Sequence, residues 1–191
     1  MNLKYVQEVL IPHRLRSIAA MNLAAKYILS WGKPVSIEIS FNGKLSIEGL
    51  STAFTNPVIE SGIIHSRAIL EFMGLRLHDG ALANIKLPRR KDDIGIESFS
   101  NFSGPLPLIS PEKVRATYEG STSESEQALI SILKTSNKAL AHFTVYSEDI
   151  KAEIGLLEIA SRGIDALMAN NFYIPLGINP PDFQIKSTPR H

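Results

Sequence analysis

The sequence predicts a mainly α-helical fold, a four- to five-helix bundle that carries one N-terminal β-hairpin. Three observations lead to this prediction. Several long segments repeat apolar side chains at steps of three and four residues, which is the period of an α-helix. One segment, residues 35–48, instead alternates apolar and polar residues on both sides of a turn. Proline, glycine and helix-capping residues separate these segments.

The first predicted helix ends at Trp31-Gly32-Lys33-Pro34, where a glycine is followed by a proline. One stripe along this helix is apolar and consists of Leu15, Ile18, Met21, Ala25, Ile28 and Leu29. The predicted hairpin follows, with Asn42-Gly43 at its turn because both residues tolerate positive φ. Since a lone hairpin is only marginally stable in water, we expect it to lie on the helical core or to pair with a partner.

The second predicted helix has Asn56 as its N-cap and Pro57 at its first helical position, and it runs to Gly74. Apolar side chains cover most of its circumference. A narrow polar strip interrupts them and carries Glu60, Arg67 and Glu71. A helix that is apolar on two sides belongs in the middle of a bundle.

The segment from residue 76 to residue 121 is rich in glycine and proline, and we predict an irregular connection with one short helix from Pro111 to Tyr118. Capping boxes that start at Ser121 and Ser123 predict the next helix, which runs to about Phe143. The acidic run 147–149 begins the last long helix.

The length of 191 residues fits a single domain over residues 1–174, followed by a flexible tail over residues 175–191. The formal net charge is +1, so the chain lacks the broad positive excess of many nucleic-acid-binding proteins.

Cysteine is absent, which excludes disulfides, thiolate nucleophiles and Cys-ligated metal sites. No stretch is apolar over the length of a membrane span and no secretory signal is present, so we expect no membrane segment and a cytoplasmic location.

The sequence contains no motif for a metal or a cofactor, and we expect neither. None of the five histidines has a spacing typical of a zinc site. The glycine-rich phosphate loop, the dinucleotide-binding fingerprint and the nucleophile elbow of serine hydrolases are also missing.

The run from Thr135 to Thr144 places an amide, a cation and an imidazole within two helical turns. Lys138 and His142 are four residues apart and share one helix face, whereas Asn137 lies about 140° away from His142 around the axis. An imidazole beside a lysine suits general acid–base chemistry or a phosphate contact, which makes these three residues the candidate catalytic set. The alternative is structural: His142 bonds a backbone carbonyl at the edge of the core, and Lys138 is solvated.

The same run, from Asn137 to Thr144, resembles the late-helix signature of HEPN-type helical domains, which is an arginine, a polar residue and, a few positions later, a histidine. Residues 64–72 are similar to the Arg-x-Leu-x-x-Phe helix found upstream in such proteins, and the loop 92–94 fits between them. The resemblance spans about residues 57–170. It implies a helical bundle that is frequently a dimer. The active members are metal-independent ribonucleases, many of them in toxin–antitoxin or defence systems.

The sequence departs from the HEPN signature at Ser136, which stands where the family has its arginine. A guanidinium holds a scissile phosphate through two charge-assisted hydrogen bonds, which a serine cannot do. We therefore expect a catalytically degenerate HEPN-like module that acts by protein or RNA binding, as a homodimer. Two alternatives stay open. One is a metal-independent ribonuclease that uses His142, and the other is a bundle with a small-molecule pocket.

Four basic residues are candidates for nucleic-acid binding: Arg67, Arg89, Arg90 and Lys91. Each also has a structural interpretation. Arg67 is four residues from Glu71 and is able to form an ion pair with it. The run 89–91 precedes Asp92 and Asp93, which is typical of a solvated loop with balanced charge.

Overall fold

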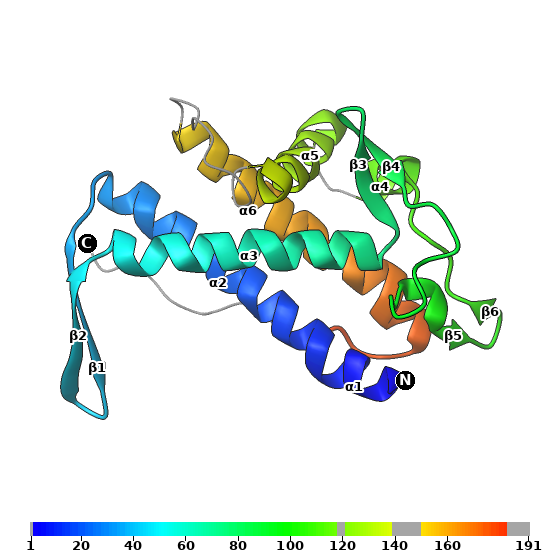
Figure 1. Cartoon of the computed structure of the whole chain (residues 1–191), viewed down its shortest axis with the longest axis horizontal. Helices are drawn as coiled ribbons and strands as arrows, with labels where there is room; N and C mark the ends of the chain where they lie inside the picture. Colours follow the sequence, from blue (N-terminus) through cyan, green and yellow to red (C-terminus); the bar gives the residue numbers. More distant parts are fainter. Residues whose placement is uncertain (1, 118–120, 139–149, 183–191) are drawn as a thin grey trace.

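The structure is a computed structural model that describes residues 2–117, 121–138 and 150–182. It is mainly α-helical, as predicted, with long helices packed across one another (Figure 1). The chain begins with one continuous helical segment made of α1 (Leu3–Tyr5), a π-helical turn (Val6–Leu10) and α2 (Ile11–Trp31). Gly32 ends it in the left-handed conformation with φ 68°, and its N–H donates to Ile28 O at 3.0 Å. This confirms the predicted end of the first helix.

Helix α3 (Thr52–Phe72) packs along α2 and also touches α5 and α6, which gives it the central position that its apolar circumference predicts (Figure 1). The two helices approach closely at Gly62. A Cβ atom on this glycine would lie only 2.2 Å from the Cβ of Met21. Met21 is fully buried, so this crossing is part of the core.

The predicted start of α3 at Asn56 and Pro57 is wrong, because the helix begins at Thr52 and Pro57 lies inside it. The reason is the closure of the preceding hairpin at Ser51. The backbone N–H of Ser51 donates to Val35 O at 2.8 Å, and its carbonyl accepts from the N–H of Thr55 at 2.8 Å. One residue thus ends the hairpin and starts the helix, and Pro57 costs only one hydrogen bond near the N-terminal end.

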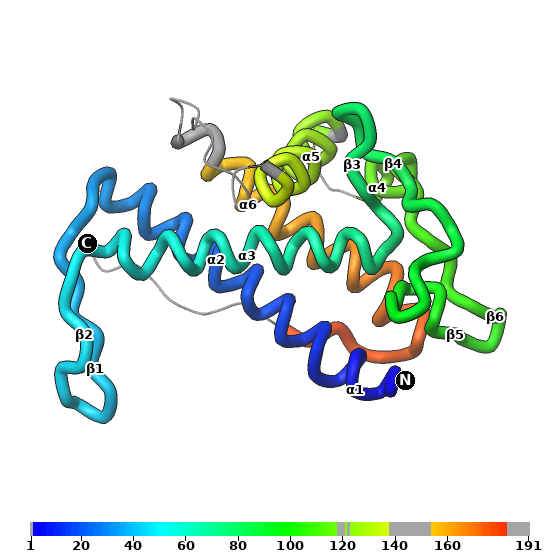
Figure 2. The backbone as a smooth tube through the Cα atoms, viewed as in Figure 1, coloured from blue at the N-terminus to red at the C-terminus, as the bar shows by residue number. Residues whose placement is uncertain are grey.

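The predicted first hairpin is confirmed. Strands β1 (Ser36–Phe41) and β2 (Lys44–Leu50) pair antiparallel around Asn42 and Gly43, whose φ angles are 51° and 76°. The hairpin does not lie on the helical core. It projects away from the helices, as the tube in Figure 2 shows, and most of its side chains are exposed.

A second hairpin replaces part of the predicted irregular connection. Strands β3 (Leu75–His78) and β4 (Ala81–Asn84) pair around Asp79 and Gly80, with φ angles of 50° and 82°. Unlike the first hairpin it packs on the body, because Leu75 and Leu82 are buried. A 3-10 turn (Ile96–Ser98) and the short strands β5 (Ser100–Asn101) and β6 (Gly104–Pro105) follow.

The remaining helices lie at the predicted positions, although the predicted helix end at about Phe143 and the predicted start of the last helix at 147–149 lie outside the described residues. They are α4 (Pro111–Thr117), α5 (Thr122–Lys138) and α6 (Ile150–Met168). After α6 a π-helical turn (Ala169–Tyr173) and a 3-10 turn (Ile174–Leu176) continue the chain. The first part of the predicted tail packs on the body, because Asn101 donates to Pro175 O at 3.2 Å and Ile178 N–H donates to Tyr173 O at 2.9 Å.

Aromatic rings close the core at the end of α3. Phe72, Phe99 and Phe172 meet edge to face, with centroids 5.0–5.9 Å apart. They come from α3, from the segment after the second hairpin and from the turn after α6, so this cluster ties together three distant parts of the chain. Each helix within the described residues is too short or too polar to cross a membrane.

Candidate functional site

The helix that carries the candidate catalytic residues is only partly described. Asn137 is exposed near the end of α5, Lys138 is the last described residue of that helix, and His142 lies outside the described residues. Ser136 is 7% exposed, and its hydroxyl donates to Leu133 O at 3.0 Å. The position that the HEPN resemblance would assign to an arginine is therefore occupied by a buried serine that bonds its own helix.

Arg67 forms the ion pair that its spacing suggests. Its Nε donates to Glu71 Oε1 at 2.8 Å, and both side chains are about two-fifths exposed. An exposed pair at this spacing contributes only about 0.3–0.5 kcal/mol. The guanidinium is on the surface, but a carboxylate already neutralises it.

Arg89 has a structural role. Its side chain is 12% exposed, and two of its nitrogens donate to the carbonyl oxygens of Glu71 and Phe72, at 2.9 and 3.0 Å. The Glu97 carboxylate accepts from Nε and Nη2 of the same guanidinium. Arg89 thus caps the C-terminal end of α3, where carbonyl groups lack helical partners. We do not include it in a nucleic-acid site.

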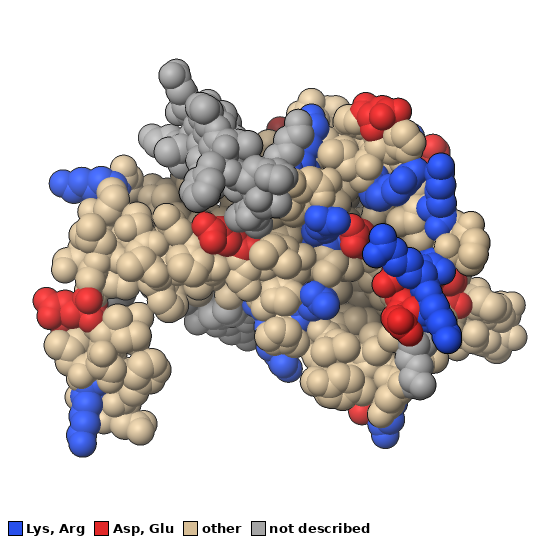
Figure 3. Space-filling model, viewed as in Figure 1, with Lys and Arg blue, Asp and Glu red and all other residues tan. Residues whose placement is uncertain are grey.

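Arg90 and Lys91 are exposed, and a turn closes behind them through Asp93 N–H and Arg90 O at 3.0 Å. Asp92 and Asp93 follow at once and are exposed as well. Figure 3 shows basic and acidic side chains intermingled over this end of the molecule. The run therefore lies in the charge-balanced loop of its structural interpretation, not in a continuous basic surface.

An Arg–His cluster that the sequence did not reveal lies between α2 and α3. The rings of His13 and His65 meet edge to face, with centroids 5.2 Å apart, and Arg14 Nη1 donates to His65 Nδ1 at 3.1 Å. Burial, then the Arg14 guanidinium and His13, hold the pKa of His65 below its usual value. Because a guanidinium only donates, Nδ1 of His65 is the bare nitrogen and Nε2 carries the proton.

A surface hollow of about 220 Å³ opens beside this cluster, lined by Ser17, Ala20, Pro57, Val58 and Ser61. Ser17 is one turn from His13 on α2, and its hydroxyl donates to His13 O at 3.1 Å. Ser61 is one turn from His65 on α3. The hollow and the Arg–His cluster are therefore neighbouring parts of the same α2–α3 groove.

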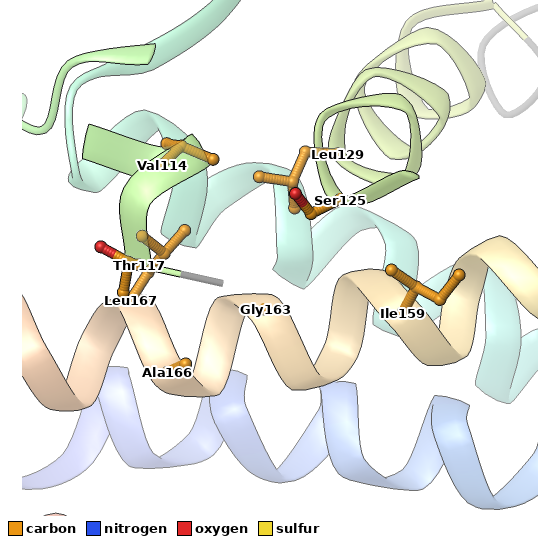
Figure 4. Close-up of a pocket in the computed structure, with 8 residues that line it drawn as sticks. All are labelled: Val114, Thr117, Ser125, Leu129, Ile159, Gly163, Ala166 and Leu167. Carbon is orange, nitrogen blue, oxygen red and sulfur yellow. The ribbon is translucent and has the colours of Figure 1, made fainter. Parts of the chain in front are cut away.

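A second, apolar cavity lies between α4, α5 and α6 (Figure 4). It measures only about 10 Å³, and Val114, Leu129, Ile159 and Leu167 are among the side chains around it. This is about the space of one water molecule. It does not support the alternative of a small-molecule pocket inside the bundle.

The first hairpin presents an apolar face. Ile37, Ile39 and Phe41 alternate along β1 on one face, and Ile47 of β2 pairs with Ile39 there. Phe41 is 62% exposed and Ile47 is 50% exposed. On the other face, which also carries Leu45 and Leu50, Glu38 lies opposite Glu48, and this pair disfavours the hairpin on its own because like charges face each other.

A buried polar pair lies toward the C-terminal end of α6. Burial, with a smaller contribution from Asp182, raises the pKa of Asp165 to about 6. Burial and the neighbouring Asp165 raise the pKa of Tyr173 to about 12. Asp165 Oδ1 and the Tyr173 hydroxyl have no hydrogen-bond partner in the described structure. We expect Asp165 to make the stability of the fold depend on pH.

The comparisons identify no relative: no protein-family model, no curated protein and no solved structure matches the chain. Within the described residues, no three His, Asp or Glu side chains lie together so that they could hold a metal ion. The sequence missed the Arg–His cluster because Arg14 and His65 are 51 positions apart and belong to no local motif.

Proposed function

We propose that this chain is a non-catalytic helical module that acts by protein binding, and that its first partner is a second copy of itself. The observation that carries the proposal is the open edge of β1 on a hairpin that projects from the body with its apolar face exposed (Figure 1). The buried serine at position 136 supports a module without the ribonuclease arginine.

The backbone of β1 has a free hydrogen-bonding edge within the described residues, since its sheet has only two strands. Val35 and Ser51 bond each other at the base of the hairpin, and Phe41 pairs with Lys44 beside the turn. Backbone groups of odd-numbered residues from Val35 to Phe41 therefore point toward β2. Those of Ser36, Glu38 and Ser40 point outward and are available to another strand.

Strand β1 is also the less protected edge of the hairpin. Proteins usually guard an edge with lysine, proline or a bulge. Strand β2 carries Lys44 and an extra residue at the register shift opposite Ile39 and Ser40. Strand β1 has β-branched and aromatic residues, no proline and a single charge at Glu38.

One antiparallel register suits a two-fold axis through Ile39. It places Ile37 opposite Phe41 of the second copy and Glu38 opposite Ser40, which are favourable or neutral cross-strand neighbours. If each strand is shifted by one residue, Glu38 lies opposite Glu38 of the second copy. Repulsion between the two carboxylates disfavours that register. The resulting four-stranded sheet exceeds the roughly three strands that an independent sheet needs.

A single cysteine tests this register directly, because the natural chain has none. In the proposed dimer the two copies of Ile39 form a non-hydrogen-bonded pair with Cα atoms about 4.5 Å apart, within the range of a disulfide. Under mild oxidation Ile39→Cys should give a covalent dimer of about 42 kDa, twice the 21.0 kDa chain. Phe41→Cys is the matched control, because its two copies are more than about 10 Å apart in this register.

Light scattering on reduced protein measures the dimer without a crosslink. Ile39→Glu should dissociate it, since two carboxylates would meet at the axis. Ser40→Lys should preserve or tighten it, because the lysine faces Glu38 of the other copy. A wild-type mass of 21.0 kDa at about 10 µM, with equal crosslinking of both cysteine variants, would contradict the proposal.

The alternative of a ribonuclease that uses His142 makes the opposite prediction for RNA. We expect no cleavage of structured or unstructured RNA in the presence of a chelator, by either the wild type or His142→Ala. Cleavage by the wild type that disappears in His142→Ala would overturn the non-catalytic assignment.

A further inference from the structure

The α2–α3 groove has features that the proposed hairpin dimer does not use. One end of the groove consists of the Arg14 guanidinium and the imidazoles of His13 and His65, and the hollow beside it has about 220 Å³ of space. The salt bridges among described residues involve neither Arg14 nor these two imidazoles. Among the described residues, this end of the groove therefore gathers hydrogen-bond donors that no carboxylate pairs with.

The donors at this end suit an oxyanion better than a metal ion. Arg14 uses one N–H for His65 and has four further donors, and His65 presents its Nε2–H. A metal site needs bare nitrogens and carboxylates, whereas Nδ1 of His65 is already bonded to a guanidinium. A phosphate accepts several charge-assisted hydrogen bonds at once and is matched to arginine geometry.

The hollow next to these donors has the size and character for the rest of a small molecule. Ala20, Pro57 and Val58 give it apolar walls, and Ser17 and Ser61 line it as well. Its roughly 220 Å³ is below the usual 300–1,000 Å³ of a drug-sized pocket, so the occupant is small.

We propose that the α2–α3 groove binds a small phosphate monoester, with the phosphate held by Arg14, His13 and His65 and the organic part in the hollow between Ser17 and Ser61. This site is independent of the hairpin dimer.

The imidazole of His65 reports on this site. Arg14 and His13 both favour the neutral ring, and a bound dianion would offset them. In an NMR titration of the full chain, saturating ribose 5-phosphate should therefore raise the pKa of His65 by about one unit, and amide shifts should centre on Ser17 and Ser61. Ribose without phosphate should change neither.

Two charge-matched variants distinguish binding by the Arg–His cluster from a general effect of net charge. Arg14→Gln should weaken ribose 5-phosphate binding at least tenfold, and Lys86→Gln, an exposed cation elsewhere with the same change in charge, should leave it unchanged. Ile39→Glu should also leave it unchanged, which keeps this test separate from the dimer.

Three outcomes would overturn the proposal. The first is no response of His65 to the ester in the wild type, a result that needs no variant to fold. The second is equal affinity for inorganic phosphate and ribose 5-phosphate, which would remove the hollow from the site. The third is much tighter binding of a short single-stranded RNA through Arg14, which would assign the groove to a nucleic acid.

Discussion

The two main hairpins of this protein have the same turn and opposite surroundings. Asn42-Gly43 and Asp79-Gly80 both place two consecutive residues at positive φ between antiparallel strands. Yet β1–β2 projects into solvent, whereas β3–β4 buries Leu75 and Leu82 against the helices. Turn chemistry decides that two strands pair. It does not decide whether the pair belongs to the core.

The second hairpin is also fixed through polar contacts. Asn84 Nδ2 donates to Ile109 O at 2.7 Å, and the N–H of Ile109 donates to Met73 O at 2.9 Å. The first hairpin is joined to the body at its base, around Val35 and Ser51. We therefore expect the body with β3–β4 to unfold as one unit and the β1–β2 hairpin to contribute little to it.

The largest expected effect comes from truncation inside the second hairpin. Leu75→Ala should lower the free energy of unfolding by about 3 kcal/mol, because Leu75 is 0% exposed and its loss leaves a cavity. Leu45→Ala, at a side chain that is 54% exposed in the first hairpin, should cost less than about 0.5 kcal/mol. Urea denaturation of both variants measures the two losses in the free energy of unfolding. Similar losses would contradict the difference between the two hairpins.

The next effect concerns the loop that leads out of the second hairpin. Arg89→Ala should cost about 2 kcal/mol, because it leaves Glu97 and the carbonyls at the end of α3 without their donor. Arg90→Ala, one residue on and exposed, should stay within about 0.5 kcal/mol. Gly95→Ala should resemble Arg89→Ala, since a Cβ there would lie 2.2 Å from the guanidinium. Equal losses in the free energy of unfolding for Arg89→Ala and Arg90→Ala would contradict the capping role of Arg89.

A smaller effect should appear in the pH dependence of the body. The pKa of Asp165 is raised to about 6 in the folded state. The folded state therefore favours the protonated carboxyl. Its contribution to the free energy of unfolding is fully present below about pH 4 and is lost as the pH rises through 6. Asp165→Asn should therefore be more stable than the wild type by about 1–2 kcal/mol at pH 8, with the difference vanishing near pH 4. Thermal melts across this range test the sign. A benefit that is greatest at acidic pH would refute it.

The smallest global effect is expected in the first turn. Gly43→Ala places a Cβ at φ 76°, which costs about 1–2 kcal/mol locally. Hydrogen exchange in β1 and β2 should accelerate, while the melting temperature of the body changes by less than about 2 °C. A matching loss of protection in α2 and α3 would show that the hairpin is coupled to the core.

Local signals predicted much of the fold, and particular residues show where they failed. The stop at Gly32 and the turn at Asn42-Gly43 were predictable because each depends on a few adjacent residues. The turn at Asp79-Gly80 carries the same signal, flanked by Leu77 and Leu82, and could have been found. Pro57 misled the prediction, because Ser51 starts the helix through a contact with Val35, which a local reading does not include.

The candidate site was less predictable than the fold. The basic run at 89–91 looks uniform in sequence, but Arg89 is half-buried and pairs with Glu97, while Arg90 and Lys91 are exposed. The pair of His13 and His65 exists only because α2 and α3 pack with Gly62 against Met21.

The sequence by itself determined the helices, the first hairpin and the absence of thiol chemistry, because periodicity, turn residues and composition act over short distances. Only the tertiary structure decided which hairpin enters the core, where α3 begins and which side chains meet in the α2–α3 groove. Each of these depends on contacts between residues far apart in the chain. A local sequence pattern does not predict the free energy of such contacts.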